Sequence, residues 1–182
     1  MSDSVNHLDE VALARYLETN VEGFKGPLKA IKFDGGQSNP TFKIEAASGD
    51  YVLRRQPPGK LLKSAHAVDR EYRVLDALKD TEVPVAKVYH LCEDREVIGS
   101  MFYIMEFCAG RIFWDSALPE LERDERAAYY DEMNRVLAAM HNVNVEEVGL
   151  SDYGKPGNYF ERQFTRWNSQ YRASEMGTID SM

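Results

Sequence analysis

Hydrophobic residues alternate with polar ones in several short runs and recur at helical spacing in four longer stretches. Leu13, Tyr16 and Leu17 lie three or four positions apart, which predicts a helix over 8–20. Short alternating or continuous apolar runs are typical of strands. The predicted strands are Leu28–Phe33, Phe42–Glu45, Tyr51–Arg54, Val85–Cys92 and Met101–Phe107.

The helix predicted over 65–78 carries one acidic residue on its apolar side. Val68, Leu75 and their neighbours at helical spacing form the apolar stripe, and Glu71 lies within it. A carboxylate on a buried face needs a partner, because otherwise it becomes protonated. Arg54, at the end of the third predicted strand, is the candidate partner. The alternative is that Glu71 lies at the edge of the stripe and reaches solvent.

The order of the elements predicts an α+β fold. Three strands form an antiparallel meander, a helix follows, and two more strands complete the sheet. The small residues of 108–111 then suggest a hinge, and two helices are predicted after it, over 122–141 and 159–171. We therefore expect one domain over 1–107 and the start of a second over 108–182.

An apolar stripe also marks the helix predicted over 122–141. Tyr130, Met133, Leu137 and Met140 recur at helical spacing. Such a stripe is more often core packing than a cofactor site, so we predict that it is the buried side of this helix.

Two adjacent glycines organise the turn between the first two predicted strands. The stretch from Phe33 to Phe42 places Gly35 and Gly36 beside small polar residues. Because glycine adopts positive φ readily, such a loop can fold tightly and present successive N–H groups to a phosphate. An ordinary hairpin turn has the same composition, so this stretch alone leaves both interpretations open.

Composition narrows the range of partners. The 182-residue chain carries a formal net charge of −8, which argues against nucleic-acid binding and against adsorption to anionic membranes. Apolar residues make up 43% of it, enough for a core, yet no apolar run is long enough to span a membrane. Cys92 and Cys108 form no Cys-x-x-Cys pair, and the polar first residues lack a signal-peptide pattern. We expect a soluble, cytoplasmic protein.

Taken in order, these features resemble the aminoglycoside phosphotransferase family, which has a protein-kinase-like fold. More narrowly, the chain resembles the branch that also occurs fused to acyl-CoA dehydrogenase domains. The stretches that carry the likeness are Gly35–Phe42, Tyr51–Gly59, Arg70–Leu75, Tyr103–Phe107 and Leu137–His141. The resemblance implies a five-stranded antiparallel N-lobe sheet with one main helix, followed by a hinge and the helical start of the C-lobe.

The resemblance also implies how a nucleotide, ATP or GTP with Mg²⁺, would be bound in the complete enzyme. Arg54 stands in place of the strand-three lysine of kinases, where it would contact the phosphates and pair with Glu71, although a planar guanidinium differs from a compact ammonium. Arg55 is the adjacent alternative, but strand alternation places it on the opposite face. The implied cofactor-binding residues are Gly35, Gly36, Gln37, Ser38, Asn39, Arg54, Glu71 and the hinge residues Glu106, Phe107 and Cys108.

The catalytic elements of that family do not occur in this sequence. Its members carry a His-Gly-Asp-x-x-x-x-Asn loop that supplies the base and one metal ligand, and a later Asp that supplies another. None of the four histidines, which are His7, His66, His90 and His141, is followed by Gly-Asp. We therefore expect no catalytic and no metal-binding residue in this N-terminal portion, and negligible turnover from it alone.

Three functions remain open from the sequence. The first is part of a phosphotransferase that acts on a small hydroxylated molecule, such as a hydroxyacyl thioester or another metabolite. The second is a non-catalytic nucleotide-binding or interaction module. The third is an α+β domain whose glycine loop is only a turn. The apolar side of the last predicted helix additionally suggests self-association.

Overall fold

A computed structural model of the chain describes residues 8–34, 38–59, 66–155, 157–175 and 177. The chain divides into two compact units, Met1–Asn144 and Val145–Met182. The domain boundary predicted between residues 107 and 108 lies within the first unit and stays a prediction.

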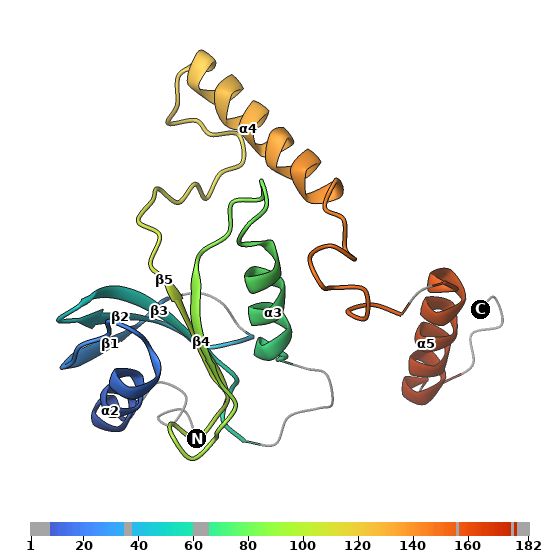
Figure 1. Ribbon diagram of the computed structural model, residues 1–182. Coiled ribbons are helices and arrows are strands. Elements are labelled where there is room, and N and C mark those ends of the chain that lie inside the picture. Colours follow the sequence, from blue (N-terminus) through green and yellow to red (C-terminus); the bar gives the residue numbers. More distant parts are fainter. Residues whose placement is uncertain (1–7, 35–37, 60–65, 156, 176, 178–182) are drawn as a thin grey trace. The chain divides into compact units, whose positions relative to one another are not determined.

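A five-stranded antiparallel sheet lies at the centre of the first unit, as predicted. Its strands are β1 (Leu28–Lys32), β2 (Thr41–Ala46), β3 (Gly49–Arg55), β4 (Val88–Cys92) and β5 (Phe102–Glu106). Their spatial order is β1-β2-β3-β5-β4 (Figure 1). The first three strands form the expected meander, and β5 pairs with both β3 and β4.

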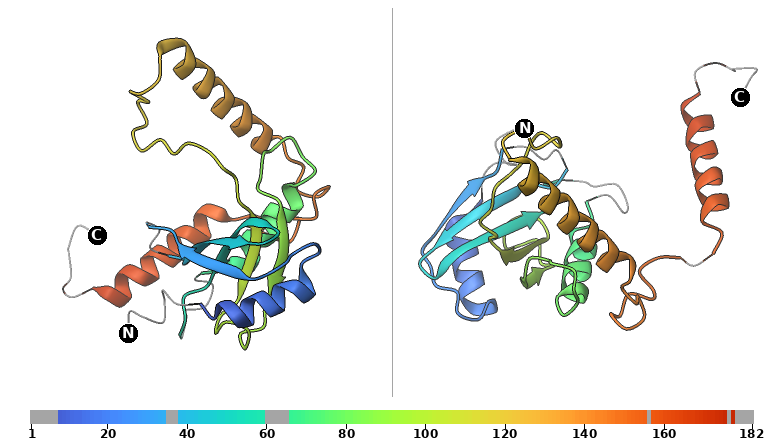
Figure 2. Two further views of the ribbon diagram at one scale, coloured as in Figure 1. Left: turned by 90° about the vertical axis from the view of Figure 1, so that its left-hand side faces the viewer. Right: turned by 90° about the horizontal axis from the view of Figure 1, so that it is seen from above.

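Helix α2 (Glu10–Asn20) packs on one face of this sheet (Figure 2). Asp9 caps its first turn, since the Asp9 carboxylate accepts a hydrogen bond of 2.9 Å from the backbone N–H of Ala12. Helical spacing places Leu13 and Leu17 on the same side, and both are fully buried. The sheet residues in this core are Leu28, Phe42, Ile44, Tyr51, Leu53, Cys92, Phe102 and Ile104.

Helix α3 (Val68–Leu78) lies against β4 and β5. Because side chains alternate along a strand, Arg54 points to the face opposite the α2 core, and Arg55 points into the core side. Arg55 is 2% exposed, and this burial lowers the pKa of its guanidinium. The predicted separation of the two arginines onto opposite faces is therefore confirmed.

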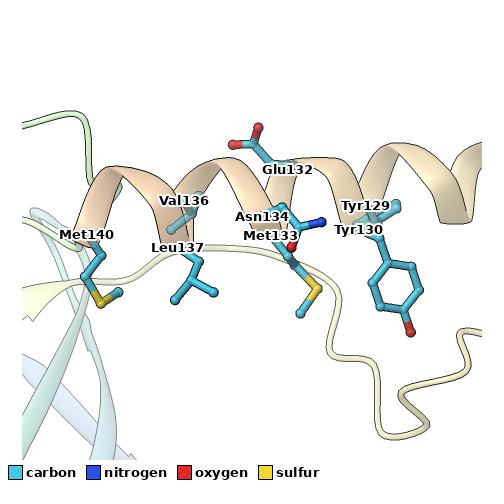
Figure 3. Close-up of a pocket in the computed structure, with 8 residues that line it drawn as sticks. All are labelled: Tyr129, Tyr130, Glu132, Met133, Asn134, Val136, Leu137 and Met140. Atoms are coloured by element: carbon cyan, nitrogen blue, oxygen red, sulfur yellow. The ribbon is translucent and has the colours of Figure 1, made fainter. Parts of the chain in front are cut away.

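Helix α4 (Arg123–His141) differs from the prediction. Tyr130, Met133, Leu137 and Met140 do share one side of the helix, but their side chains are 43% to 61% exposed. They border an apolar hollow of about 480 Å³ along the helix (Figure 3). The prediction that this side is buried is wrong for this structure, because apolar spacing identifies a face without identifying what covers it.

The second unit is built around helix α5 (Tyr159–Ser174). Arg162 joins its first turn to the preceding loop, since Nη2 donates to the backbone carbonyl of Lys155 at 2.9 Å. The aromatic residues Phe160, Phe164 and Trp167 are more than 60% exposed. None of the helices in the described part of the chain combines the length and the apolar composition that a membrane span requires.

Candidate functional site

Three polar side chains lie in a row across the sheet face opposite the α2 core. The strand register pairs Thr41 of β2 with Arg54 of β3, and Arg54 with Tyr103 of β5. Residues directly opposite on antiparallel strands have neighbouring side chains on the same face. Arg54 Nη1 donates to Thr41 Oγ1 at 3.0 Å, so the guanidinium is held from the β2 side.

Glu71 of α3 meets this row from the helix. Arg54 Nε donates to Glu71 Oε2 at 2.5 Å, and Arg54 Nη2 lies 3.4 Å from Oε1. The Tyr103 hydroxyl donates to the same carboxylate at 3.2 Å. The ion pair predicted between Arg54 and Glu71 is therefore present. Because the Glu71 side chain is 34% exposed, it also reaches solvent.

This ion pair orients Arg54 more than it stabilises the fold. The side chains of Arg54 and Glu71 are 31% and 34% exposed, so water screens their attraction. A pair of this kind contributes roughly 1 kcal/mol or less to folding. Burial, helped by the Glu71 carboxylate, raises the pKa of Tyr103, so its hydroxyl stays protonated and remains a donor.

Asn39 connects the end of the glycine-rich loop to Glu71. Its side chain is buried, and Nδ2 donates to Glu71 Oε1 at 2.9 Å. Asn39 Oδ1 lies 2.9 Å from Nδ1 of His66. His66 lies two residues before the first residue of α3. The structure thus assigns the Asn39 side chain two protein partners, and its predicted contact with a cofactor stays a prediction.

The rest of the glycine-rich loop is only partly described. A backbone hydrogen bond of 3.0 Å from Phe33 N to Thr41 O closes its base. Ser38 is exposed. Gly35, Gly36 and Gln37 lie outside the described residues, so the predicted orientation of the loop amides toward a phosphate stays a prediction.

The predicted hinge begins where β5 ends. Glu106 is bonded to Lys87, since its N–H donates to the Lys87 carbonyl at 2.8 Å and its carboxylate accepts from the Lys87 N–H at 3.3 Å. Lys43 Nζ lies 4.9 Å from the centroid of the Phe107 ring, so the start of the hinge contacts β2. Cys108 is exposed. Phe107 and Cys108 follow the last paired residue of β5, and their role in base binding stays a prediction.

Sequence reasoning missed three members of this cluster. Thr41 and Tyr103 lie directly beside Arg54, and strand alternation reveals them once the register is known. His66 has no comparable signal, because its place depends on the turn that precedes α3. Across the ranges given above, no three His, Cys, Asp or Glu side chains gather as a candidate metal site.

Comparison with characterised protein families supports the resemblance seen in the sequence. Residues 29–181 match the profile of the Phosphotransferase enzyme family, APH. The chain is 51% identical over 179 residues to an Arabidopsis thaliana protein described as a probable acyl-CoA dehydrogenase, IBR3. It is 47% identical over 157 residues to acyl-CoA dehydrogenase family member 10 of Mus musculus.

These alignments cover 94% and 86% of the chain but only 22% and 15% of the relatives, so the chain spans about a fifth of their length or less. A solved structure from Ralstonia eutropha JMP134, assigned to the aminoglycoside phosphotransferases, is 54% identical with a TM-score of 0.80. That alignment covers 95% of this chain and 50% of the solved chain. Because the family profile spans most of the sequence and a solved structure shares the fold, the chain belongs to the APH phosphotransferase enzyme family.

Proposed function

We propose that this chain forms the nucleotide-binding part of an ATP- or GTP-dependent phosphotransferase that phosphorylates a hydroxyl group of a small molecule. The observation that carries the proposal is the Arg54–Glu71 ion pair, which is bonded to Asn39 and Thr41 at the end of the glycine-rich loop, in a chain of the APH family. In kinase-like enzymes a basic residue on the third strand, paired with a helix glutamate, positions the nucleotide phosphates.

The residues present fit a polyphosphate ligand. A guanidinium has five N–H donors, and the described contacts of Arg54 engage three of them, with Thr41 and Glu71. The remaining donors of this partly exposed group suit phosphate oxygens. In the proposal, Ser38 N–H also faces the phosphates, and the backbone of Phe107 and Cys108 holds the base. Bound nucleotide with Mg²⁺ supplies the phosphoryl group and neutralises its charge.

The proposed acceptor is a hydroxyacyl thioester. Two of the relatives carry acyl-CoA dehydrogenase names, and the chain matches only a small share of each. A phosphotransferase segment within such a protein would share its acyl thioester substrates. A discriminating measurement compares phosphate transfer to a hydroxyacyl thioester and to its parent acyl thioester in a protein that contains this chain and a catalytic loop.

Calorimetric titration with Mg²⁺-ATP and Mg²⁺-GTP tests the nucleotide site. We expect binding by the wild-type chain, and affinity lower by about tenfold or more in Arg54→Gln, because a charged hydrogen bond contributes roughly 1.5–3 kcal/mol. Arg135→Gln is the matched control, since Arg135 forms an exposed ion pair with Glu132 on α4. Equal affinities for both variants, or no binding by the wild type, would contradict the proposal.

The second candidate is a non-catalytic nucleotide-binding or interaction module. The absence of a His-Gly-Asp sequence from residues 1–182 favours negligible turnover by this chain alone. Transfer of labelled phosphate from ATP by the purified chain would overturn that prediction. A longer protein that contains this chain and a catalytic loop provides the second measurement. If it binds nucleotide but transfers no phosphate, the non-catalytic nucleotide-binding module is favoured.

A further inference from the structure

The orientation of the Asn39 side chain is fixed by the chemistry of its neighbours. An ionised carboxylate accepts hydrogen bonds and donates none, so the group 2.9 Å from Glu71 Oε1 is the Asn39 NH₂. The side-chain oxygen of Asn39, Oδ1, therefore faces Nδ1 of His66 at 2.9 Å. Because that oxygen only accepts, Nδ1 of His66 carries a proton in both the neutral and the charged imidazole.

His66 itself is held in an unusual backbone conformation. Its φ of +58° lies in the left-handed region, which residues other than glycine seldom adopt. The buried Gln56 side chain donates from Nε2 to the His66 carbonyl at 3.0 Å, and Val68 N–H donates to the same carbonyl at 2.9 Å. The Gln56 N–H is bonded in turn to Met101 O, next to β5. The sheet and the start of α3 together maintain the strained residue.

Hydrogen bonds connect Asn39, Thr41, Arg54 and Glu71 in a closed ring of contacts. Arg54 Nη1 donates to Thr41 Oγ1, and Thr41 Oγ1 donates to the backbone carbonyl of Asn39 at 3.1 Å. The Asn39 side chain donates to Glu71, which accepts from Arg54 Nε. The end of the glycine-rich loop is therefore bonded to both members of the ion pair.

We propose that Asn39 and His66 are positioning residues that fasten the end of the glycine-rich loop to Glu71, so that the loop end and the Arg54–Glu71 pair keep one fixed arrangement. Neither residue acts on a phosphate directly in this role. Its consequence for nucleotide affinity rests on the proposed function, whereas the hydrogen-bond arrangement does not.

A pair of variants at position 66 separates positioning from backbone strain. His66→Gly removes the imidazole donor and accepts the left-handed conformation without strain. His66→Asn keeps an N–H donor at the position of Nδ1, and asparagine tolerates the left-handed region. Amide hydrogen exchange across residues 38–42 and 68–72 is the readout. We expect it to be about tenfold faster in His66→Gly, as for one lost hydrogen bond, and near wild type in His66→Asn.

Nitrogen chemical shifts of His66 in the wild-type chain provide a measurement that needs no variant. The proposal requires the neutral imidazole to carry its proton on Nδ1, and a neutral form protonated on Nε2 would overturn it. Unchanged exchange in His66→Gly, or equally fast exchange in both variants, would also overturn it. Titration of the same proteins with Mg²⁺-ATP keeps the two proposals apart. Failure of all of them to bind counts against the nucleotide site alone.

Discussion

Glu71 accepts hydrogen bonds at both carboxylate oxygens. Asn39 and Arg54 Nη2 donate to Oε1, and Arg54 Nε and Tyr103 donate to Oε2. A glutamine at this position turns an NH₂ group toward at least one of these donors, so Glu71→Gln loses an acceptor as well as the charge. We expect affinity for Mg²⁺-ATP to fall about tenfold or more in calorimetric titration, with Arg54 no longer oriented.

Glu132→Gln is the control for that measurement, because Glu132 forms a comparable ion pair with Arg135 on α4. We expect it to leave nucleotide affinity unchanged. Wild-type affinity in Glu71→Gln would show that the Arg54–Glu71 pair has no part in binding.

The half-buried position of His90 leads us to expect that the stability of the fold depends on pH. Its Nε2 lies 3.0 Å from the Tyr16 hydroxyl, and burial lowers the pKa of His90. The unfolded chain, with a histidine pKa of about 6.5, therefore binds more protons than the native state as the solution is acidified. The stability contributed by neutral His90 is present above that value and is lost as the pH falls toward the lowered native pKa.

Urea unfolding at pH 7.5 and pH 5.5 checks this sign. We expect wild type to lose more stability on acidification than His90→Gln, whose side chain does not titrate and can still form a hydrogen bond with Tyr16. His141→Gln, on the exposed end of α4, should follow the wild type. Equal pH dependence in all three proteins would exclude His90 as a source of it.

Helix α2 offers a matched test of core packing at the scale of one element. Leu17 is fully buried in the cluster beneath the sheet, whereas Val11 of the same helix is 71% exposed. Leu17→Ala removes buried methyl groups and leaves a cavity, so we expect a loss of about 2–5 kcal/mol in the free energy of unfolding. Val11→Ala should change it by roughly 0.5 kcal/mol or less. Similar losses in the two urea titrations would mean that α2 is not fixed on the sheet as described.

The elements of the first unit could largely be predicted from local patterns. The alternation of apolar and polar residues predicts β2. Gly49 and Pro57 mark the two ends of β3, because such turn signals lie within a few residues of the element that they bound. The predicted strand at Val85–Cys92 begins three residues too early, since the register of β4 with β5 starts only at Val88. Boundaries depend on pairing partners that are distant in the sequence.

The candidate site could be predicted only in its outline. Glu71 was found because a carboxylate on an apolar stripe requires a partner, and Arg54 because it ends the neighbouring strand. The Asn39–His66 contact joins residues 27 positions apart, and nothing in the spacing of either residue indicates it. Contacts of this kind arise from the turn before α3 and from tertiary packing, which periodicity does not encode.

At the scale of the whole molecule, the exposed apolar side of α4 predicts self-association. Tyr130, Met133, Leu137 and Met140 present a continuous apolar strip, and soluble monomers seldom expose such a surface without a partner (Figure 3). We expect the sedimentation coefficient of the purified chain to rise with protein concentration. Leu137→Glu places a charge in the middle of this strip and should shift the protein toward monomer.

Ala128→Glu is the matched control for the strip on α4, because Ala128 is exposed and lies on the other side of the same helix. Both variants add one negative charge, so a general effect of net charge on association should appear in both of them equally. An effect confined to Leu137→Glu assigns the association to the apolar side of α4. A wild-type chain that stays monomeric at all concentrations, or equal behaviour of the two variants, would show that this surface does not drive association.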